Sequence, residues 1–193
     1  AVNERYRRTV ELLLDIAPRV FAEPDFAMKG GTAINLFVRE LPRLSVDIDL
    51  VFVPKSLPRE EALAQIAAAL VRVQRALERF PGVKVRAGGA DGEEVKLFVD
   101  RGDYRVKVEV NKVFRGTAYP VVDRALGRAA SDYFEREADV RLLDVDEIYG
   151  SKLVAAMDRQ HPRDLFDVMQ LFDHGGITPA IRRCFVVYLA CHN

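Results

Sequence analysis

The spacing of apolar residues at the start of the chain predicts a helix, a short strand and a second helix. Apolar side chains recur at helical intervals from Val10 to Ala17, and we expect Pro18 to close that segment. The apolar stretch 26–28 predicts a strand that runs into a glycine turn. A second helix is expected to begin near Thr32, because a hydroxyl side chain suits a helix start.

The middle of the chain combines strand patterns with one long helical pattern. Residues 46–53 are apolar apart from two aspartates and rich in β-branched side chains, which is typical of a strand inside a sheet. Residues 58–80 have helical periodicity, which Pro81 and Gly82 end. Three strand-like runs follow, at 83–87, 94–99 and 104–111. This alternation of helices and strands indicates an α+β fold with a mixed sheet.

Beyond residue 120 the apolar spacing predicts helices. Helical spacing is found at 144–157, 162–172 and 178–189. Pro162 and Pro179 suit first helical turns, because proline has no amide hydrogen to lose there. We therefore divide the chain into an α+β core at residues 1–120 and a helical C-terminal part at residues 121–193 that packs on the core.

The composition is that of an ordinary globular protein. Of its 193 residues, 49% are hydrophobic and 30% are charged. Its 29 lysine and arginine residues balance 29 aspartate and glutamate residues, which argues against binding nucleic acid by bulk positive charge. No apolar run is long enough for a membrane span, and the two cysteines match neither a zinc spacing nor a disulfide framework. We expect a cytoplasmic protein with reduced thiols.

Two aspartates within the strand at 46–53 are the first candidates for chemistry. Side chains two apart on a strand share a face, so Asp47 and Asp49 stand side by side. Two carboxylates in an apolar strand repel each other, and a divalent cation such as Mg²⁺ or Mn²⁺ relieves that repulsion. Glu109 on another strand could complete a metal triad. The alternatives are a solvent-facing pair on an edge strand and, for Glu109, a charge pair with Lys107.

The glycine turn before this strand could approach a ligand closely. Gly30 and Gly31 precede a helix start, whose free amides can receive phosphate, and Thr32 could add a hydroxyl there. The alternative is a tight turn that needs glycine for its dihedral angles. Ser45 is expected on the same face as Asp47, with its hydroxyl beside the metal site, although a serine before a strand is also a common turn residue.

Two signatures resemble those of a known family. The first is Lys29-Gly30-Gly31-Thr32-Ala33 followed by Ser45-x-Asp47-x-Asp49-Leu50, and the second joins residues 152–159 to Pro162-Arg163-Asp164-Leu165-Phe166-Asp167. Together they resemble the polymerase-β-like nucleotidyltransferases in the form used by AbiEii toxins, and are most similar to the mycobacterial MenT-type toxins. The resemblance implies a polymerase-β-like core with a mixed sheet.

The resemblance also implies an activity and its residues. An enzyme of this family would transfer a nucleoside monophosphate from a nucleoside triphosphate to the 3′ end of tRNA. A pyrimidine is expected, cytidylate from CTP, and the extra nucleotide would block aminoacylation. The resemblance implies that Lys152 and Asp164 are catalytic. Lys152 would bind the nucleotide phosphates as a mobile charge, and Asp164 would orient that lysine or the entering nucleotide. A cognate antitoxin protein would be the partner.

Each of these assignments has an alternative. Lys152 could be an exposed helix lysine, and Asp164 one of a helix-start cluster. Arginine rows could bind RNA or form solvated faces paired with nearby glutamates; they are Arg72, Arg75 and Arg79, and Arg5 and Arg8. The same metal site could instead modify a protein hydroxyl. A catalytically inactive nucleotide-binding regulatory domain is the third possibility.

Overall fold

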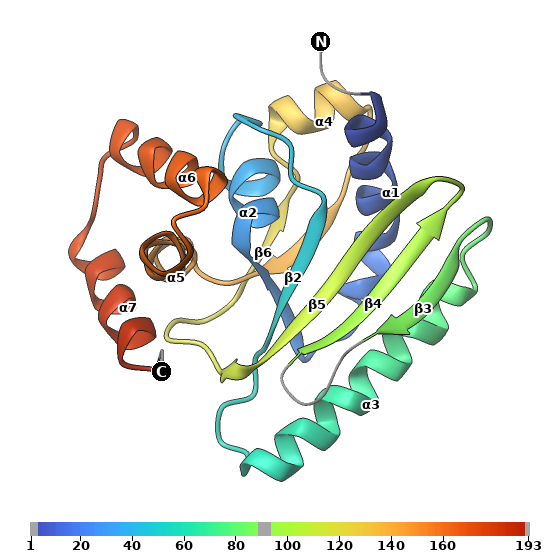
Figure 1. Ribbon diagram of the computed structural model, residues 1–193, viewed down its shortest axis with the longest axis horizontal. Coiled ribbons are helices and arrows are strands. Elements are labelled where there is room, and N and C mark those ends of the chain that lie inside the picture. Colours follow the sequence, from blue (N-terminus) through green and yellow to red (C-terminus); the bar gives the residue numbers. More distant parts are fainter. Residues whose placement is uncertain (1–3, 89–93, 192–193) are drawn as a thin grey trace.

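The computed structural model describes residues 4–88 and 94–191, which form one seven-stranded sheet with helices around it (Figure 1). The sheet is mixed, in the order β3-β4-β5-β2-β1-β7-β6, which confirms the predicted α+β class. The strands are β1 (Phe26–Lys29), β2 (Asp47–Phe52), β3 (Lys84–Gly88), β4 (Glu94–Arg101), β5 (Tyr104–Arg115), β6 (Val122–Ala125) and β7 (Asp139–Leu142).

The helices form two groups around this sheet. Their bounds are α1 (Glu4–Val20), α2 (Gly30–Thr32), the π-helical η1 (Ala33–Val38), α3 (Arg59–Glu78), α4 (Arg128–Phe134), α5 (Val145–Arg159), α6 (Pro162–Asp173) and α7 (Pro179–Ala190). Helices α1 and α3 pack on the sheet and on each other, whereas α6 and α7 pack on α5 at the other side of β2 (Figure 1). Within the described ranges, no helix is both long and apolar enough to cross a membrane.

Strand β2 lies in the middle of the sheet. It pairs antiparallel with β1 and parallel with β5. Its apolar side chains, Ile48 and Leu50, are fully buried, whereas Asp47 and Asp49 lie on the opposite face and are partly exposed. The pairing register puts three charged side chains in one row, Lys29, Asp49 and Glu109. The alternative of a carboxylate pair on an edge strand is therefore wrong.

The first helix continues past the proline that was expected to close it. Pro18 lies inside α1, which ends at Val20. The amide groups of Phe21 and Ala22 still donate to carbonyl groups one turn earlier, at 3.0 and 3.1 Å. Val20 is fully buried in the core. Burial of this last turn offsets the one helical hydrogen bond that proline removes.

The sheet also continues past residue 120, in the part of the chain where helices were expected. Strands β6 and β7 pair with each other, and Leu142 of β7 aligns with Met28 of β1. The helical C-terminal part expected at residues 121–193 thus also contains two strands that were not expected, at residues 122–125 and 139–142. Both are four residues long, too short to give a recognisable period. The helical part begins with α5, close to the expected residue 144.

Candidate active site

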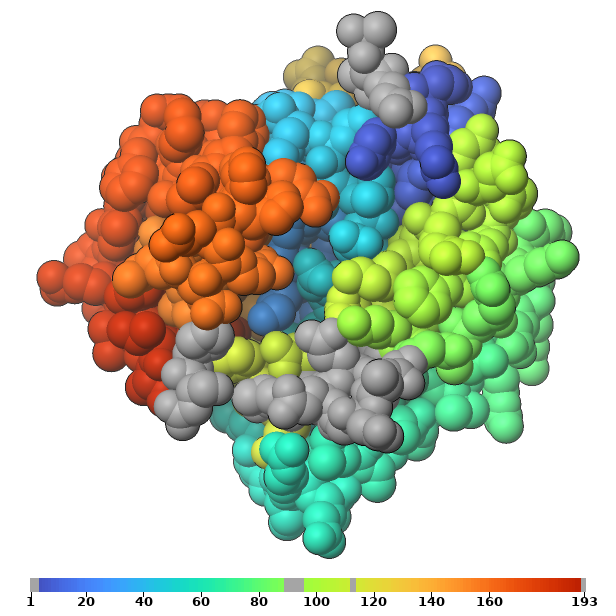
Figure 2. All heavy atoms as spheres, viewed as in Figure 1, coloured from blue at the N-terminus to red at the C-terminus, as the bar shows by residue number. Residues whose placement is uncertain are grey.

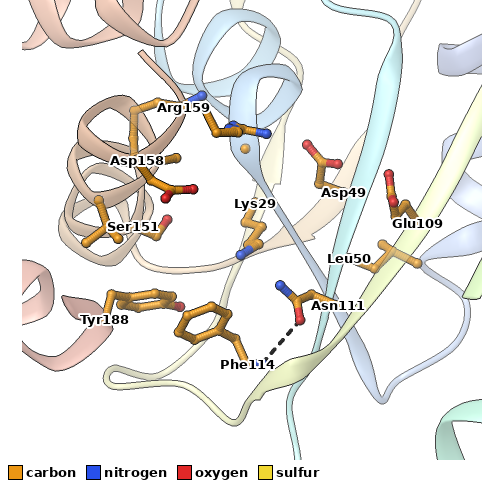
Figure 3. A pocket seen from close by; sticks show the side chains of 14 residues that line it. Lys29, Asp49, Leu50, Glu109, Asn111, Phe114, Ser151, Asp158, Arg159 and Tyr188 are labelled. Atoms are coloured by element: carbon orange, nitrogen blue, oxygen red, sulfur yellow. Dashed lines mark hydrogen bonds between the residues drawn. The ribbon is translucent and has the colours of Figure 1, made fainter. Parts of the chain in front are cut away.

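A cavity of about 360 Å³ lies between the polar face of the central strands and helix α5. Figure 2 shows this face hollowed between the orange C-terminal helices and the yellow-green strands. Charged side chains from the sheet and from α5 point into it (Figure 3). The charged residues that line the cavity include Lys29, Asp49, Glu109, Lys152 and Arg159. The volume lies within the range of small-molecule sites in proteins.

Asp49 faces this cavity, and Asp47 lies two residues earlier on the same face of β2. Among the described residues, neither carboxylate takes part in a hydrogen bond or salt bridge. Burial raises the pKa of Asp49, the Lys29 ammonium opposes that shift, and the charge of Asp47 adds to it. Two adjacent carboxylates with free oxygens are thus held in a partly dehydrated wall, as the sequence pattern predicted.

Gly30 makes room for the Asp49 carboxylate. Its φ of +80° is a conformation that side chains with a Cβ rarely adopt. A Cβ at this position would also lie 2.3 Å from Asp49 Oδ2. Gly31 is close to a different group, because a Cβ there would lie 2.7 Å from an Arg43 nitrogen. The turn therefore needs glycine both for its dihedral angle and for close packing against charged side chains.

The hydroxyls of Thr32 and Ser45 hold this turn against the strand. Both side chains are buried, and their oxygens lie 2.9 Å apart. Thr32 donates to the backbone carbonyl of Asp47. Because Thr32 has only one hydroxyl hydrogen, Ser45 donates to Thr32. The phosphate-binding role of Thr32 and the catalytic role of Ser45 stay predictions, and the observed contacts assign both hydroxyls a local positioning task.

A buried carboxylate, Asp167, connects the two sequence signatures. It lies on α6, is fully buried, and receives both guanidinium donors of Arg43 at 2.8 and 2.6 Å. Asn35 donates to the same carboxylate at 3.0 Å, and Lys152 Nζ lies 3.1 Å from it. Arg43 and Asn35 belong to the segment between the first glycine and β2. Helices α5 and α6 are therefore tied to that segment by charge-assisted hydrogen bonds.

Lys152 is enclosed by this network. Its side chain is 6% exposed, and Nζ donates to Asp164 at 2.8 Å, so the alternative of an exposed helix lysine is wrong. Arg159 lies 3.0 Å from the other oxygen of Asp164. Burial alone would raise the pKa of Asp164, but the bond from Lys152 and the charge of Arg159 hold it below its usual value. Asp164 thus fixes Lys152 in place, and the lysine has little of the mobility expected for it.

Lys29 is a cavity residue that the sequence showed only as part of a motif. It stands opposite Asp49 in the β1–β2 register. Its Nζ lies 5.5 and 5.7 Å from the ring centres of Phe114 and Tyr188, within cation–π distance (Figure 3). Burial lowers the pKa of Lys29, and the charge of Asp49 opposes that shift. The lysine has no salt bridge to any described residue.

Glu109 has cationic partners. Its carboxylate lies 2.8 Å from Lys96 Nζ and 2.5 Å from Lys107 Nζ, so the expected charge pair is present. In the described part of the chain, no three His, Cys, Asp or Glu side chains are grouped to hold a metal ion. The role of Glu109 as a metal ligand stays a prediction.

The arginine rows proposed for RNA are partly occupied by carboxylates. Arg72 donates to both oxygens of Glu23, at 2.8 and 2.9 Å. Arg8 pairs with Glu4 and Glu11, each at 3.0 Å. The alternative of a partly neutralised arginine face therefore describes these two residues, although Arg72 is paired to a residue outside its own helix.

The fold is shared with a family of nucleotidyltransferase toxins. The chain matches the family model described as Nucleotidyl transferase AbiEii toxin, Type IV TA system, over residues 11–193. It therefore belongs to this toxin family, which confirms the resemblance seen in the two signatures. No curated protein sequence matches the chain.

A solved structure supports the fold. The chain is similar to MenT4, a nucleotidyltransferase toxin from Mycobacterium tuberculosis H37Rv, with a TM-score of 0.66 and 18% sequence identity. The similarity covers 94% of this chain and 64% of that toxin, so the chain spans less than two thirds of the length of MenT4.

Substitution of Gly30 tests the packing against Asp49. Gly30→Ala and Gly82→Ala should each cost about 1–2 kcal/mol of stability, because both positions have a similar positive φ, +80° and +78°. A Cβ at Gly82 would meet nothing within 4 Å, so it is the matched control. Only Gly30→Ala should also displace the Asp49 carboxylate and abolish Mn²⁺ binding, measured by paramagnetic relaxation. Equal Mn²⁺ affinity in the two variants would contradict this packing.

The Asp167 network should make a large contribution to stability. Asp167→Asn leaves Arg43 and Lys152 without a full counter-charge, so the free energy of unfolding should fall by roughly 3–5 kcal/mol. Asp173→Asn, at an exposed position on the same helix, should change it by less than about 0.5 kcal/mol. Urea denaturation of both variants measures the difference. A loss for Asp167→Asn no larger than for the control would show that the network does not hold the helices.

Proposed function

We propose that this chain transfers a nucleoside monophosphate from a nucleoside triphosphate to the 3′ end of RNA in the cavity between β2 and α5. The main support is the pair Asp47 and Asp49, two neighbouring carboxylates that form no hydrogen bond or salt bridge with the described residues. Asp49 lines a cavity that Lys29 and Arg159 also line. Family membership supplies the reaction class. The cavity supports the proposal because anionic and cationic side chains line it together, as a metal-bound triphosphate requires.

The donor set fits a divalent cation. Magnesium is usually held in proteins by one or two carboxylates together with substrate phosphates and water. Asp47 and Asp49 would hold it, and the space that Gly30 leaves beside Asp49 keeps that carboxylate accessible. When bound, such a metal neutralises charge on the phosphates and lowers the pKa of an attached hydroxyl. Mg²⁺ or Mn²⁺ meets these demands equally well.

The triphosphate is assigned to the two cavity cations that remain accessible to it, Lys29 and Arg159. Lys152 is committed to Asp164 and Asp167, so it shapes the cavity wall and contributes a fixed positive charge. Lys29 is half-buried and has no salt bridge to any described residue. Arg159 pairs with Asp164, but its side chain is 61% exposed at the cavity rim. A pyrophosphate leaving group would lie against these two side chains. The partial dehydration of the cavity strengthens each such contact.

The reaction is an in-line displacement at phosphorus. The ribose 3′ hydroxyl oxygen bonds to the α-phosphorus, and the bond from that phosphorus to the oxygen bridging the β-phosphate breaks. Pyrophosphate leaves, and the hydroxyl proton passes to water. The carboxylates contribute by aligning the two reacting groups and by holding negative charge where the metal would sit.

The finer assignments rest on the family resemblance. tRNA is the proposed acceptor, and CTP the proposed donor, with aminoacylation blocked by the added nucleotide. A cognate antitoxin is the proposed protein partner in the cytoplasm. The zero net charge favours one second candidate, transfer to a protein hydroxyl, because such an acceptor does not require a basic surface. The open carboxylate pair argues against a domain without catalysis.

Labelling decides which polymer is the acceptor. Purified protein incubated with Mg²⁺ and each of the four α-labelled nucleoside triphosphates should label the tRNA in total RNA, with CTP the best donor. Asp47→Asn and Asp49→Asn should each reduce labelling by at least about 100-fold, because each removes a metal ligand at nearly constant volume. Sequencing of the RNA 3′ ends locates the addition. Label on protein alone, or full activity of both variants, would contradict the proposal.

A substitution of Lys29 tests the assignment of the triphosphate. Lys29→Met removes one charge-assisted contact, so KM for the nucleotide should rise roughly 10- to 150-fold. Lys84→Met, at an exposed position on edge strand β3, is the control and should leave KM unchanged. KM for RNA should stay the same in both variants. If initial rates gave an unchanged nucleotide KM for Lys29→Met, the triphosphate would have to lie elsewhere in the cavity.

A further inference from the structure

A second cavity adjoins the first across a pair of aromatic rings. The rings of Phe114 and Tyr188 are stacked with centroids 5.4 Å apart and line both cavities. The second cavity has a volume of about 220 Å³. Besides the two rings, its lining includes Lys55, Arg115 and Glu147. A ligand that extends past the aromatic pair from the first cavity would therefore meet a different set of charges.

The two cations of this cavity, Lys55 and Arg115, have no ion-pair partner among the described residues. Within the described residues, neither Lys55 nor Arg115 forms a salt bridge or a side-chain hydrogen bond. The Nε atom of Arg115 is buried and has no acceptor. A buried donor without an acceptor costs about 1–3 kcal/mol of stability. An external acceptor that bonded this arginine would therefore bind favourably.

Glu147, the acidic residue of this cavity, already accepts hydrogen bonds from other parts of the protein. Glu147 is 1% exposed and accepts hydrogen bonds from the backbone amides of Ala118 and Tyr119, at 2.9 to 3.1 Å. The Tyr188 hydroxyl donates to it at 2.9 Å. Its negative charge is therefore stabilised by three neighbouring donor groups, and it forms no salt bridge with Lys55 or Arg115.

Local backbone geometry brings the two cations together. Arg115 ends β5 and aligns with Phe52 in the sheet register. Gly116 follows with a φ of +81°, and its amide donates to the Phe52 carbonyl at 2.8 Å. A Cβ on Gly116 would lie 2.6 Å from Lys55 Cβ. Glycine thus lets the chain after Arg115 pack directly against Lys55.

We propose that Lys55 and Arg115 bind a backbone phosphate of the RNA whose 3′ end enters the first cavity. This inference rests on the proposed function and adds the place where the acceptor strand is held. A phosphodiester offers the acceptor oxygens that Arg115 lacks and the charge that both side chains require. The last nucleotide of the strand would then lie beside Phe114 and Tyr188, the aromatic pair between the two cavities. A site of this kind supplies local charge to a chain with no net charge.

The first test compares two matched double variants. Lys55→Gln with Arg115→Gln should raise KM for RNA roughly 10-fold and leave the nucleotide KM and kcat unchanged. Lys84→Gln with Arg124→Gln removes the same charge from the exposed edge strands β3 and β6 and should change neither. Fluorescence anisotropy without nucleotide should show the salt dependence of RNA binding reduced by about 0.7 in slope, the value for one phosphate of a single strand. Equal RNA affinity of the two double variants would overturn the proposal.

The second test identifies the phosphate. One neutral methylphosphonate linkage is placed in turn at each of the last linkages of the acceptor RNA. At one position it should weaken binding to the wild-type protein but not to the Lys55→Gln, Arg115→Gln variant. An equal effect on both proteins at every position would overturn the proposal. If the double variant melts early, the same comparison is made with Lys55→Gln alone, which changes only an exposed side chain.

These tests separate the site from the activity. Binding is measured without nucleotide, so the role of Lys55 and Arg115 can fail while the chain still adds nucleotides to RNA. Conversely, label found only on protein would contradict the proposed function, whatever the binding result. If RNA binding were weak and the same in both double variants, and label were transferred to protein, the phosphate site and the proposed function would both be overturned.

Discussion

The buried carboxylate of Asp167 is the contact on which the rest of the site depends. It bonds Arg43 and Asn35 from the segment between the glycine turn and β2, and it lies beside Lys152 on α5. Arg43 is in turn packed on Gly31 so closely that a Cβ there would collide with it. Without this carboxylate, α6 would lose its charged contacts with that segment. Helix α5 would keep only the hydrogen bond that Arg39 donates to the Tyr149 hydroxyl, at 2.7 Å, among the charged contacts described for it with that segment. Two short sequence signatures thus form one structural unit.

The basic residues of the site fall into two groups, those paired with carboxylates of the protein and those without such a partner among the described residues. Lys152 is neutralised in the protein, and exchanging such a buried ion network for apolar groups often costs little stability, so its value lies in fixing geometry. Lys29, Lys55 and Arg115 have no salt bridges to described residues and line cavities instead. Charges left without protein partners in a chain of zero net charge mark places where an external anion can bind.

The local parts of this site could be read from the sequence, and the long-range parts could not. The two-residue period fixes Asp47 and Asp49 on one face, and proline and threonine at Pro162 and Thr178 mark helix starts that the structure contains. The pairing of Lys29 with Asp49 depends on strand register, which no local pattern shows. The Arg43–Asp167 contact joins residues 124 apart. Strands β6 and β7 could not be predicted, because a strand of four residues is too short to show a period and the residues of β6 are all on the surface.

The most direct measurement is a crystal structure of the protein with Mn²⁺ and a non-hydrolysable nucleoside triphosphate, using the anomalous signal of manganese. We expect an anomalous peak between the carboxylates of Asp47 and Asp49, with the triphosphate extending toward Lys29 and Arg159. A nucleotide bound elsewhere, or manganese held only by other side chains while this cavity contains solvent, would contradict it.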